Sequence, residues 1–158
     1  MHTTIIRAMG PVLLLLMVSL AHGSLGTSMQ GQYFSSADIA SQLAHTVDGQ
    51  VFKEVAKNPE SSVIISRREK TGDVEVHSVV DDVIFAEAGH ATVTVGGQVT
   101  GNHQTEPNEW RGGEQSGGRD YSLAPGDLLL IPAGSPHRVA VAPNGSFTYL
   151  IVKTPVRQ

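Results

Sequence analysis

Short runs of β-forming residues, separated by turn signals at intervals of about ten residues, constrain the fold of this chain more than any other feature. From residue 51 onward, Gly, Pro, Asn and Asp interrupt these runs at 71–73, 96–97, 125–127 and 143–145. The apolar run at 128–131 is typical of a strand buried on both faces. No helical pattern recurs after residue 48. We therefore predict an all-β domain over residues 49–158, built as a small barrel or sandwich around a pocket.

A different pattern precedes these strands. Ser35 or Ser36 is a favourable N-cap, and apolar residues follow at four-residue spacing, at Ile39, Leu43 and Val47. We predict one short helix here, ended by Asp48-Gly49, within an N-terminal segment that covers residues 24–48.

The first 23 residues resemble a secretory signal peptide. Arg7 precedes an apolar core at 11–21, and Ala21-His22-Gly23 is a small-residue cleavage site. The core is short for a membrane span, although an uncleaved anchor is the alternative. We predict a signal peptide over residues 1–23, a secreted or periplasmic protein, and no stable membrane association after cleavage.

Charge and cysteine content exclude several classes of function. Removing residues 1–23 from the 158 leaves 135, with all 15 acidic residues and, without Arg7, 10 of the 11 basic ones, a net charge of −5. This balance argues against a nucleic-acid partner. The chain has no cysteine, so disulfides, thiol nucleophiles and cysteine-based zinc sites are excluded. Only nitrogen and oxygen ligands remain for a metal.

Two stretches contain residues that could form a site. Glu75 and His77 lie two apart among valines, so a strand would direct both side chains to one face. The polar pair Asp81-Asp82 suggests a break in the strand, after which a hairpin would bring Asp82 back beside His77.

The second stretch adds a nitrogen ligand. Pro132, Gly134 and Pro136 predict a sharp turn, after which His137 is the first residue able to resume strand alternation. Val139 and Val141 share its side of the strand, so His137 should point inward. We predict that Glu75, His77, Asp82 and His137 converge.

These residues carry a resemblance to the cupin family. The pattern Glu75-x-His77-x4-Asp82-x6-Gly89 resembles the first cupin motif, His-x-His-x(3 or 4)-Glu-x6-Gly, with Glu for the first histidine and Asp for the glutamate. The resemblance implies a single-domain cupin β-barrel, a double-sheet jelly roll.

The second cupin motif is similar to Gly126-x5-Pro132-x-Gly134-x2-His137. Here the final asparagine is replaced by Val141, and the glycine that the family places before its first ligand falls on Glu69. Together the two motifs cover roughly residues 60 to 153.

Two imidazoles with one or two carboxylates suit one divalent metal ion, Fe, Mn, Ni or Zn, better than Ca²⁺ or Cu⁺. Asp82 is one methylene shorter than the usual glutamate, so it either ligates the metal or accepts a hydrogen bond from a bound water. Glu75 is either a ligand or a general base beside the metal. The alternative is a barrel without a metal, in which both histidines are merely hydrogen-bonded.

Residues 102–121 form the least regular segment, with four glycines and mixed charge around the only tryptophan. We predict a long loop here. By resemblance, such an insert between the motifs forms a lid, and Trp110 and Arg111 are candidates for apolar and anionic contacts with a bound molecule. A solvent-exposed loop without such a role is the alternative.

Three classes of function remain. The first is a metal-dependent enzyme on a small organic molecule, by resemblance a dioxygenase, isomerase, epimerase or lyase. The second is a non-catalytic module that binds a sugar or another small ligand, with or without metal. The third is a structural barrel that only oligomerises. We favour the first, with a small-molecule ligand and a possible homodimer, since cupins often pair through their sheets.

Overall fold

The computed structural model describes residues 31–156, so the predicted signal peptide lies outside the described residues. The one described helix, α1 (Ser36–Leu43), begins after Ser35 as predicted. Ser35 and Asp38 form a capping box, in which the Ser35 hydroxyl accepts from the Asp38 backbone N–H at 3.1 Å. Leu43 is buried, but the helix ends there. Val47 instead forms a bridge with Gln50 and is exposed, so our extension of the helix to residue 47 was wrong.

Thirteen strands follow in the described part of the chain. They are β1 (Gln50–Asn58), β2 (Ser61–Arg68), β3 (Glu75–His77), β4 (Val80–Gly89), β5 (Ala91–Val95), β6 (Gln98–Thr100), β7 (His103–Glu106), β8 (Glu109–Arg111), β9 (Glu114–Ser116), β10 (Arg119–Leu123), β11 (Leu128–Ile131), β12 (His137–Ala140) and β13 (Phe147–Pro155).

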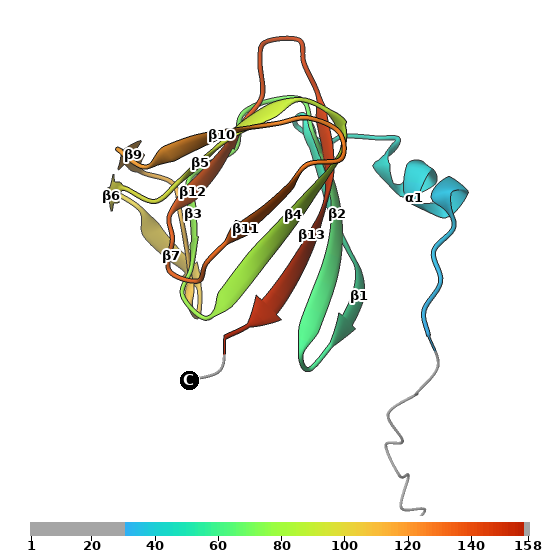
Figure 1. Cartoon of the computed structure of the whole chain (residues 1–158), viewed down its shortest axis with the longest axis horizontal. Coiled ribbons are helices and arrows are strands. Elements are labelled where there is room, and N and C mark those ends of the chain that lie inside the picture. The colour runs from blue at the N-terminus through green and yellow to red at the C-terminus, as the bar shows by residue number, and fades with distance from the viewer. Residues whose placement is uncertain (1–30, 157–158) are drawn as a thin grey trace, which may run out of the picture. The chain divides into compact units, whose positions relative to one another are not determined.

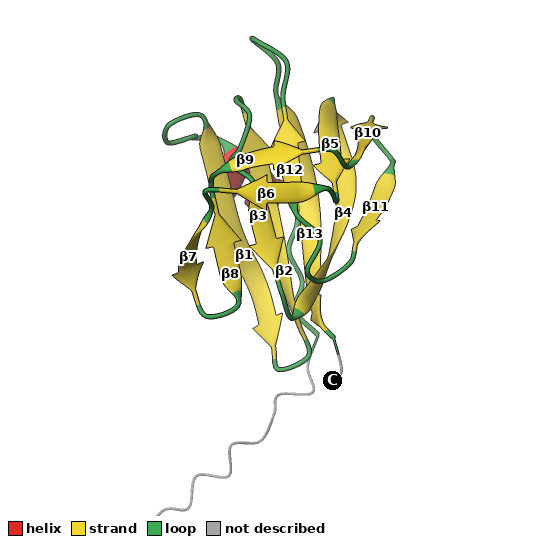
Figure 2. Ribbon diagram, turned by 90° about the vertical axis from the view of Figure 1, so that its left-hand side faces the viewer, coloured by secondary structure: helices red, strands yellow, loops and turns green. Residues whose placement is uncertain are grey.

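The strands form two large antiparallel sheets and one small one. The five-stranded sheet has the order β1-β2-β13-β4-β11 (Figure 1), and the six-stranded sheet has the order β10-β5-β12-β3-β8-β7. Strands β6 and β9 pair separately and face the viewer in Figure 2. No hydrogen-bonded ladder between described strands joins the two large sheets, so the domain is a double-sheet jelly roll. The predicted all-β fold is confirmed.

The core lies between the two large sheets because each strand alternates its side chains between inside and outside. In β13, Phe147, Tyr149 and Ile151 are buried, whereas Leu150 between them is only partly covered. Val93 and Val139 come from the six-stranded sheet and belong to the same cluster. Packing of both sheets on one core holds the domain together without a disulfide.

The segment at 102–121 is not the loop that we expected. It forms β7, β8, β9 and most of β10, joined by glycine pairs with positive φ at 112–113 and 117–118. These strands have three to five residues and carry polar side chains on both faces, so they lack the apolar alternation by which a strand is recognised.

Strand β11 also differs from expectation. Leu129 and Ile131 are buried, but Leu128 and Leu130 are 64% and 54% exposed. The reason is that Leu128 and Leu130 point to the outer face of the five-stranded sheet, where Phe85 on the interior strand β4 is also 43% exposed.

Candidate functional site

The six-stranded sheet places three predicted site residues side by side. His137 on β12 is the direct cross-strand partner of Glu75 on β3, and Glu75 in turn lies opposite Arg111 on β8. Directly opposed residues of an antiparallel pair point to the same face, so all three share the inner face. His77, two residues beyond Glu75, joins them there with Glu109 as its own partner.

Asp82 reaches the same space from the other sheet. We expected a hairpin to return Asp82 beside His77, but β3 and β4 belong to different sheets. The short connection at 78–79 crosses between the sheets, and Asp82 then faces His77 across the interior, with Oδ2 3.5 Å from His77 Nε2. The break at the polar pair was predicted, and the pairing after it was wrong.

The turn before His137 is tied to the first motif by backbone hydrogen bonds. The Gly134 N–H donates to the carbonyl of His77 at 2.7 Å, and the Ala133 N–H donates to Asp81 Oδ1 at 2.7 Å. Gly134 has a positive φ of 78°, which a residue with a side chain adopts at a cost. The two motifs therefore meet at the site.

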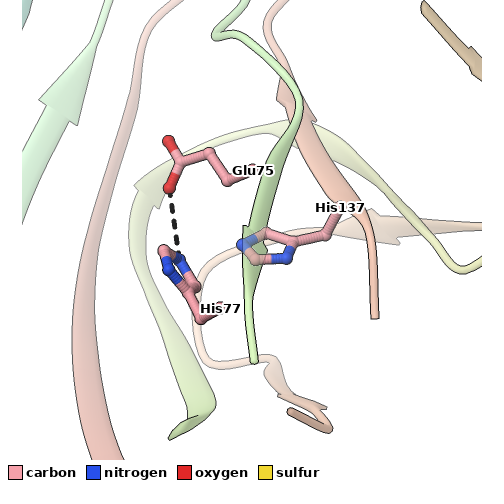
Figure 3. A group of neighbouring side chains, drawn as sticks. All are labelled: Glu75, His77 and His137. Carbon is pink, nitrogen blue, oxygen red and sulfur yellow. Dashed lines mark ion pairs between the residues drawn. The ribbon is translucent and has the colours of Figure 1, made fainter. Parts of the chain in front are cut away.

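The four predicted ligand residues converge. One ligand atom from each of Glu75, His77 and His137 lies within 4.8 Å of the others (Figure 3). The two imidazole centroids are 5.2 Å apart, and both rings are buried. Asp82 Oδ2 is 3.7 Å from His137 Nε2.

Both imidazoles turn Nε2 toward the cluster and Nδ1 away from it. His137 Nδ1 is 3.1 Å from the Ser135 carbonyl, which can only accept, so Nδ1 carries the proton. His77 Nδ1 is 3.1 Å from Glu109 Oε1. His77 Nε2 faces Glu75 Oε2 at 3.5 Å. These contacts of His77 are close but poorly aligned, and neither of its buried ring nitrogens has a well-formed hydrogen bond.

Basic side chains already neutralise the two carboxylates. Glu75 Oε1 pairs with Arg111 at 2.6 Å and with Arg68 at 3.3 Å. Lys153 donates to both oxygens of Asp82, at 2.9 and 3.0 Å. Arg68 is itself buried and also donates to the Tyr149 hydroxyl at 2.8 Å.

These surroundings shift the pKa values of two site residues. Burial alone would raise the pKa of Glu75, but the His77 imidazole and the guanidinium of Arg111 outweigh it and hold that pKa well below its usual range. Burial lowers the pKa of His137, and its contacts with Ser135 and the carboxylates only partly offset this. Glu75 is therefore a carboxylate and His137 a neutral imidazole at neutral pH.

A small cavity adjoins the cluster. It has a volume of about 20 Å³, and both polar and apolar residues line it: Phe52, Arg68, Asp73, Glu75, Asp82, Ile84, His137, Val139, Tyr149 and Ile151. This is room for one water molecule and not for an organic ligand. A larger molecule must therefore bind at the margin or displace side chains there. Arg111, about a third exposed, lies at the margin.

Sequence reasoning did not identify Arg68, Glu109 or Lys153 as site residues. Strand alternation would have shown Arg68 and Lys153, because each continues the buried positions of its strand, Ile64 in β2 and Ile151 in β13. Glu109 lies in the segment that we predicted as a loop, so its pairing with His77 across β3 and β8 could not be predicted.

The two predicted ligand contacts differ in position. Arg111 lies in the site through its pair with Glu75. Trp110 is the cross-strand partner of Val76, so it points to the opposite face of β8, away from His77. Contact of either side chain with a bound molecule stays a prediction, and the position of Trp110 does not favour it.

Comparison with known proteins gives a family model and similar structures. The model of the AraC-like ligand binding domain matches residues 112–158. A Klebsiella pneumoniae protein with a double-stranded β-helix domain is 16% identical, with a TM-score of 0.58 over 80% of this chain and 91% of that one. These similarities confirm the cupin fold that the two motifs imply.

Other similar structures support the same fold. A Thermus thermophilus protein is 21% identical, with a TM-score of 0.55 over 75% of this cupin and 94% of its own length. A Streptomyces nucleoside dehydratase is 9% identical, with a TM-score of 0.50 over 72% and 76%. No curated protein matches the sequence.

The residues of this cupin fit a divalent metal. One nitrogen of each imidazole and one oxygen of Glu75 lie within 4.8 Å of one another, and the buried nitrogens of His77 lack well-formed hydrogen bonds. Leaving such groups buried without a partner costs about 1–3 kcal/mol, which a bound cation would recover at Nε2. This donor set belongs to Fe, Mn, Ni or Zn.

Proposed function

We propose that this cupin binds one divalent metal ion, Fe, Mn, Ni or Zn, and acts on a small organic molecule by dioxygenase, isomerase, epimerase or lyase chemistry. His77, His137 and Glu75 would hold the metal, with Asp82 beside them. When bound there, the metal supplies Lewis acidity and makes a bound water more acidic.

One observation carries the proposal. Two buried imidazoles from different strands direct Nε2 to the same space as a carboxylate oxygen, while an acceptor lies against each Nδ1. A hydrogen bond from Nδ1, such as that of His137 to Ser135, orients the ring and makes Nε2 a better ligand. Buried histidines with only a structural role would need a hydrogen-bond partner at Nε2 as well.

The chain's own residues would position the substrate. Arg111 is partly exposed and pairs with Glu75, so it is able to bind an anionic group that reaches the margin of the cavity. The cavity admits only a water-sized molecule, so the substrate approaches the site with one reactive group. The nucleoside dehydratase among the similar structures supports action on a small molecule.

A second candidate is a non-catalytic ligand-binding module. The match to an AraC-like ligand binding domain favours it, as do the protein cations that already neutralise Glu75 and Asp82. Such a module would bind its ligand with or without metal and would show stabilisation by the ligand without turnover.

Two further proposals concern location and assembly. The predicted signal peptide over residues 1–23 supports export. None of the helices described is long and apolar enough to cross a membrane. Exposed Leu128 and Leu130 at the edge strand β11, beside Phe85 on β4, support a homodimer through this sheet.

Metal analysis of the purified protein, without added metal, tests the proposal. We expect about one equivalent of a transition metal in the wild type and almost none in His137→Ala. His90→Ala is the matched control, because His90 lies outside the cluster. A wild type without metal that also fails to take up added metal would favour the ligand-binding module.

A further inference from the structure

The two carboxylates of the cluster are not equivalent. Glu75 uses Oε1 for both of its arginine partners, and its Oε2 faces His77 Nε2 at 3.5 Å. Asp82 instead gives both oxygens to one ammonium group, that of Lys153. Glu75 therefore has an oxygen that no cation holds, and Asp82 has none.

The pairing of Lys153 with Asp82 is built into the sheet. The two residues are direct cross-strand partners in β13 and β4, so their side chains must lie together on the inner face. Asp82 is almost fully buried and the Lys153 side chain is 15% exposed. A buried pair of this kind is screened far less than a surface pair.

The cluster as a whole carries as many positive as negative side chains. Three carboxylates, Glu75, Asp82 and Glu109, face three cations, Arg68, Arg111 and Lys153. Because this set is already neutral, a dication gains less there than beside free carboxylates, and it is repelled most by the cation nearest to its own position.

We propose that Lys153 withholds Asp82 from the metal, so that His77, His137 and Glu75 are the only protein ligands. The inference rests on the proposed metal binding and deepens it. Lys153 acts as a positioning residue that sets the number of protein ligands. Three ligands leave more positions open for water or substrate than the four expected from the motifs, with the Asp82–Lys153 pair beside them.

The test combines two substitutions. Metal-free wild type, Asp82→Asn, Lys153→Met and the double variant are titrated with Co²⁺ by calorimetry and by visible absorption. Lys57→Met is the matched control, since Lys57 lines the same surface cleft as Lys153 but contacts only Glu54, at 3.7 Å. The absorption spectrum reports the number of ligands without any assay of activity.

We expect Asp82→Asn to leave the Co²⁺ spectrum unchanged and to weaken binding by about tenfold at most, because the ammonium of Lys153 loses its partner and repels the ion. Loss of a true ligand costs more and changes the spectrum. Lys153→Met should bind Co²⁺ at least about tenfold more tightly, with a weaker spectrum of higher coordination number, and Asn at position 82 should cancel that gain. Lys57→Met should match the wild type.

The outcomes separate the two proposals. If wild type and Lys153→Met both fail to bind Co²⁺, the proposed function and this inference fall together. If wild type binds but Asp82→Asn binds about a hundredfold more weakly, Asp82 is a ligand and only this inference is overturned. Weaker binding by Lys153→Met would overturn it as well. If Lys153→Met does not fold, Lys153→Gln replaces it, because the amide keeps a hydrogen bond to Asp82 for folding but removes the positive charge that opposes the metal.

Discussion

The buried guanidinium of Arg68 holds the site together, and Arg68→Met measures how much it contributes. Arg68 donates to Tyr149 at 2.8 Å and to Gln50 at 3.1 Å, and it pairs with Glu75 at 3.3 Å. Methionine fills a similar volume but offers no donor. The substitution therefore leaves buried acceptors without their charged partner.

The expected loss follows from these contacts. Removing one partner of a buried charge pair costs about 3–5 kcal/mol when the other charge is left alone. Glu75 keeps Arg111, so the loss at Tyr149 dominates, and we expect about 2–4 kcal/mol in total. For a domain of this size that corresponds to a fall in Tm of about 6–16 °C.

Urea unfolding of the metal-free protein, followed by the fluorescence of Trp110, measures the effect. Arg67→Met is the control, because Arg67 is the neighbouring residue on β2 but its side chain is 37% exposed and its ion pair is with Glu69. We expect the control to change the free energy of unfolding by less than about 0.5 kcal/mol. If both variants lose the same stability, our view of Arg68 as a buried organiser of the site is wrong.

Three further predictions address charge, backbone and surface. The pKa of Glu75 is lowered in the fold, so its contribution to the stability of the metal-free protein is present above about pH 4.3 and is lost as the pH falls below that value. Glu75→Gln should reduce this loss in urea unfolding measured at several pH values, and an unchanged pH dependence would contradict the cause given. Gly89→Ala should destabilise by more than about 2 kcal/mol, since the new methyl group would overlap the Ser146 carbonyl. Gly126→Ala, whose φ is also positive but which has open space around it, should cost only about 1 kcal/mol. Changing both Leu128 and Leu130 to Lys should convert a dimer into a monomer in sedimentation, and a wild type that is already monomeric would refute the proposed homodimer.

Much of the site was predictable because its residues lie on strands with readable spacing. Glu75 and His77 two apart, and His137 after a proline-rich turn, needed only the two-residue period and the turn chemistry. The meeting of the two motifs was predicted from family resemblance and the need of a buried histidine for a partner.

What could not be predicted depends on pairing between strands distant in sequence. Asp82 and Lys153 are 71 positions apart and meet only through the register of β4 and β13. The polar strands β7 to β9 gave no apolar alternation, so Glu109 was hidden in a supposed loop. The exposure of Leu128 likewise depends on which face of its sheet is covered, and no local sequence pattern shows this.

Nitrogen NMR of the two site histidines tests the central claim most directly. The claim is that His77 and His137 present Nε2 to one metal while Nδ1 keeps its proton. Spectra of ¹⁵N-labelled protein are recorded with and without one equivalent of Zn²⁺, and His77→Ala and His137→Ala assign the signals. We predict that zinc shifts Nε2 of both rings together, with Nδ1 protonated in each. A shift in only one ring, or at Nδ1, would contradict the convergence of the two imidazoles on one ion.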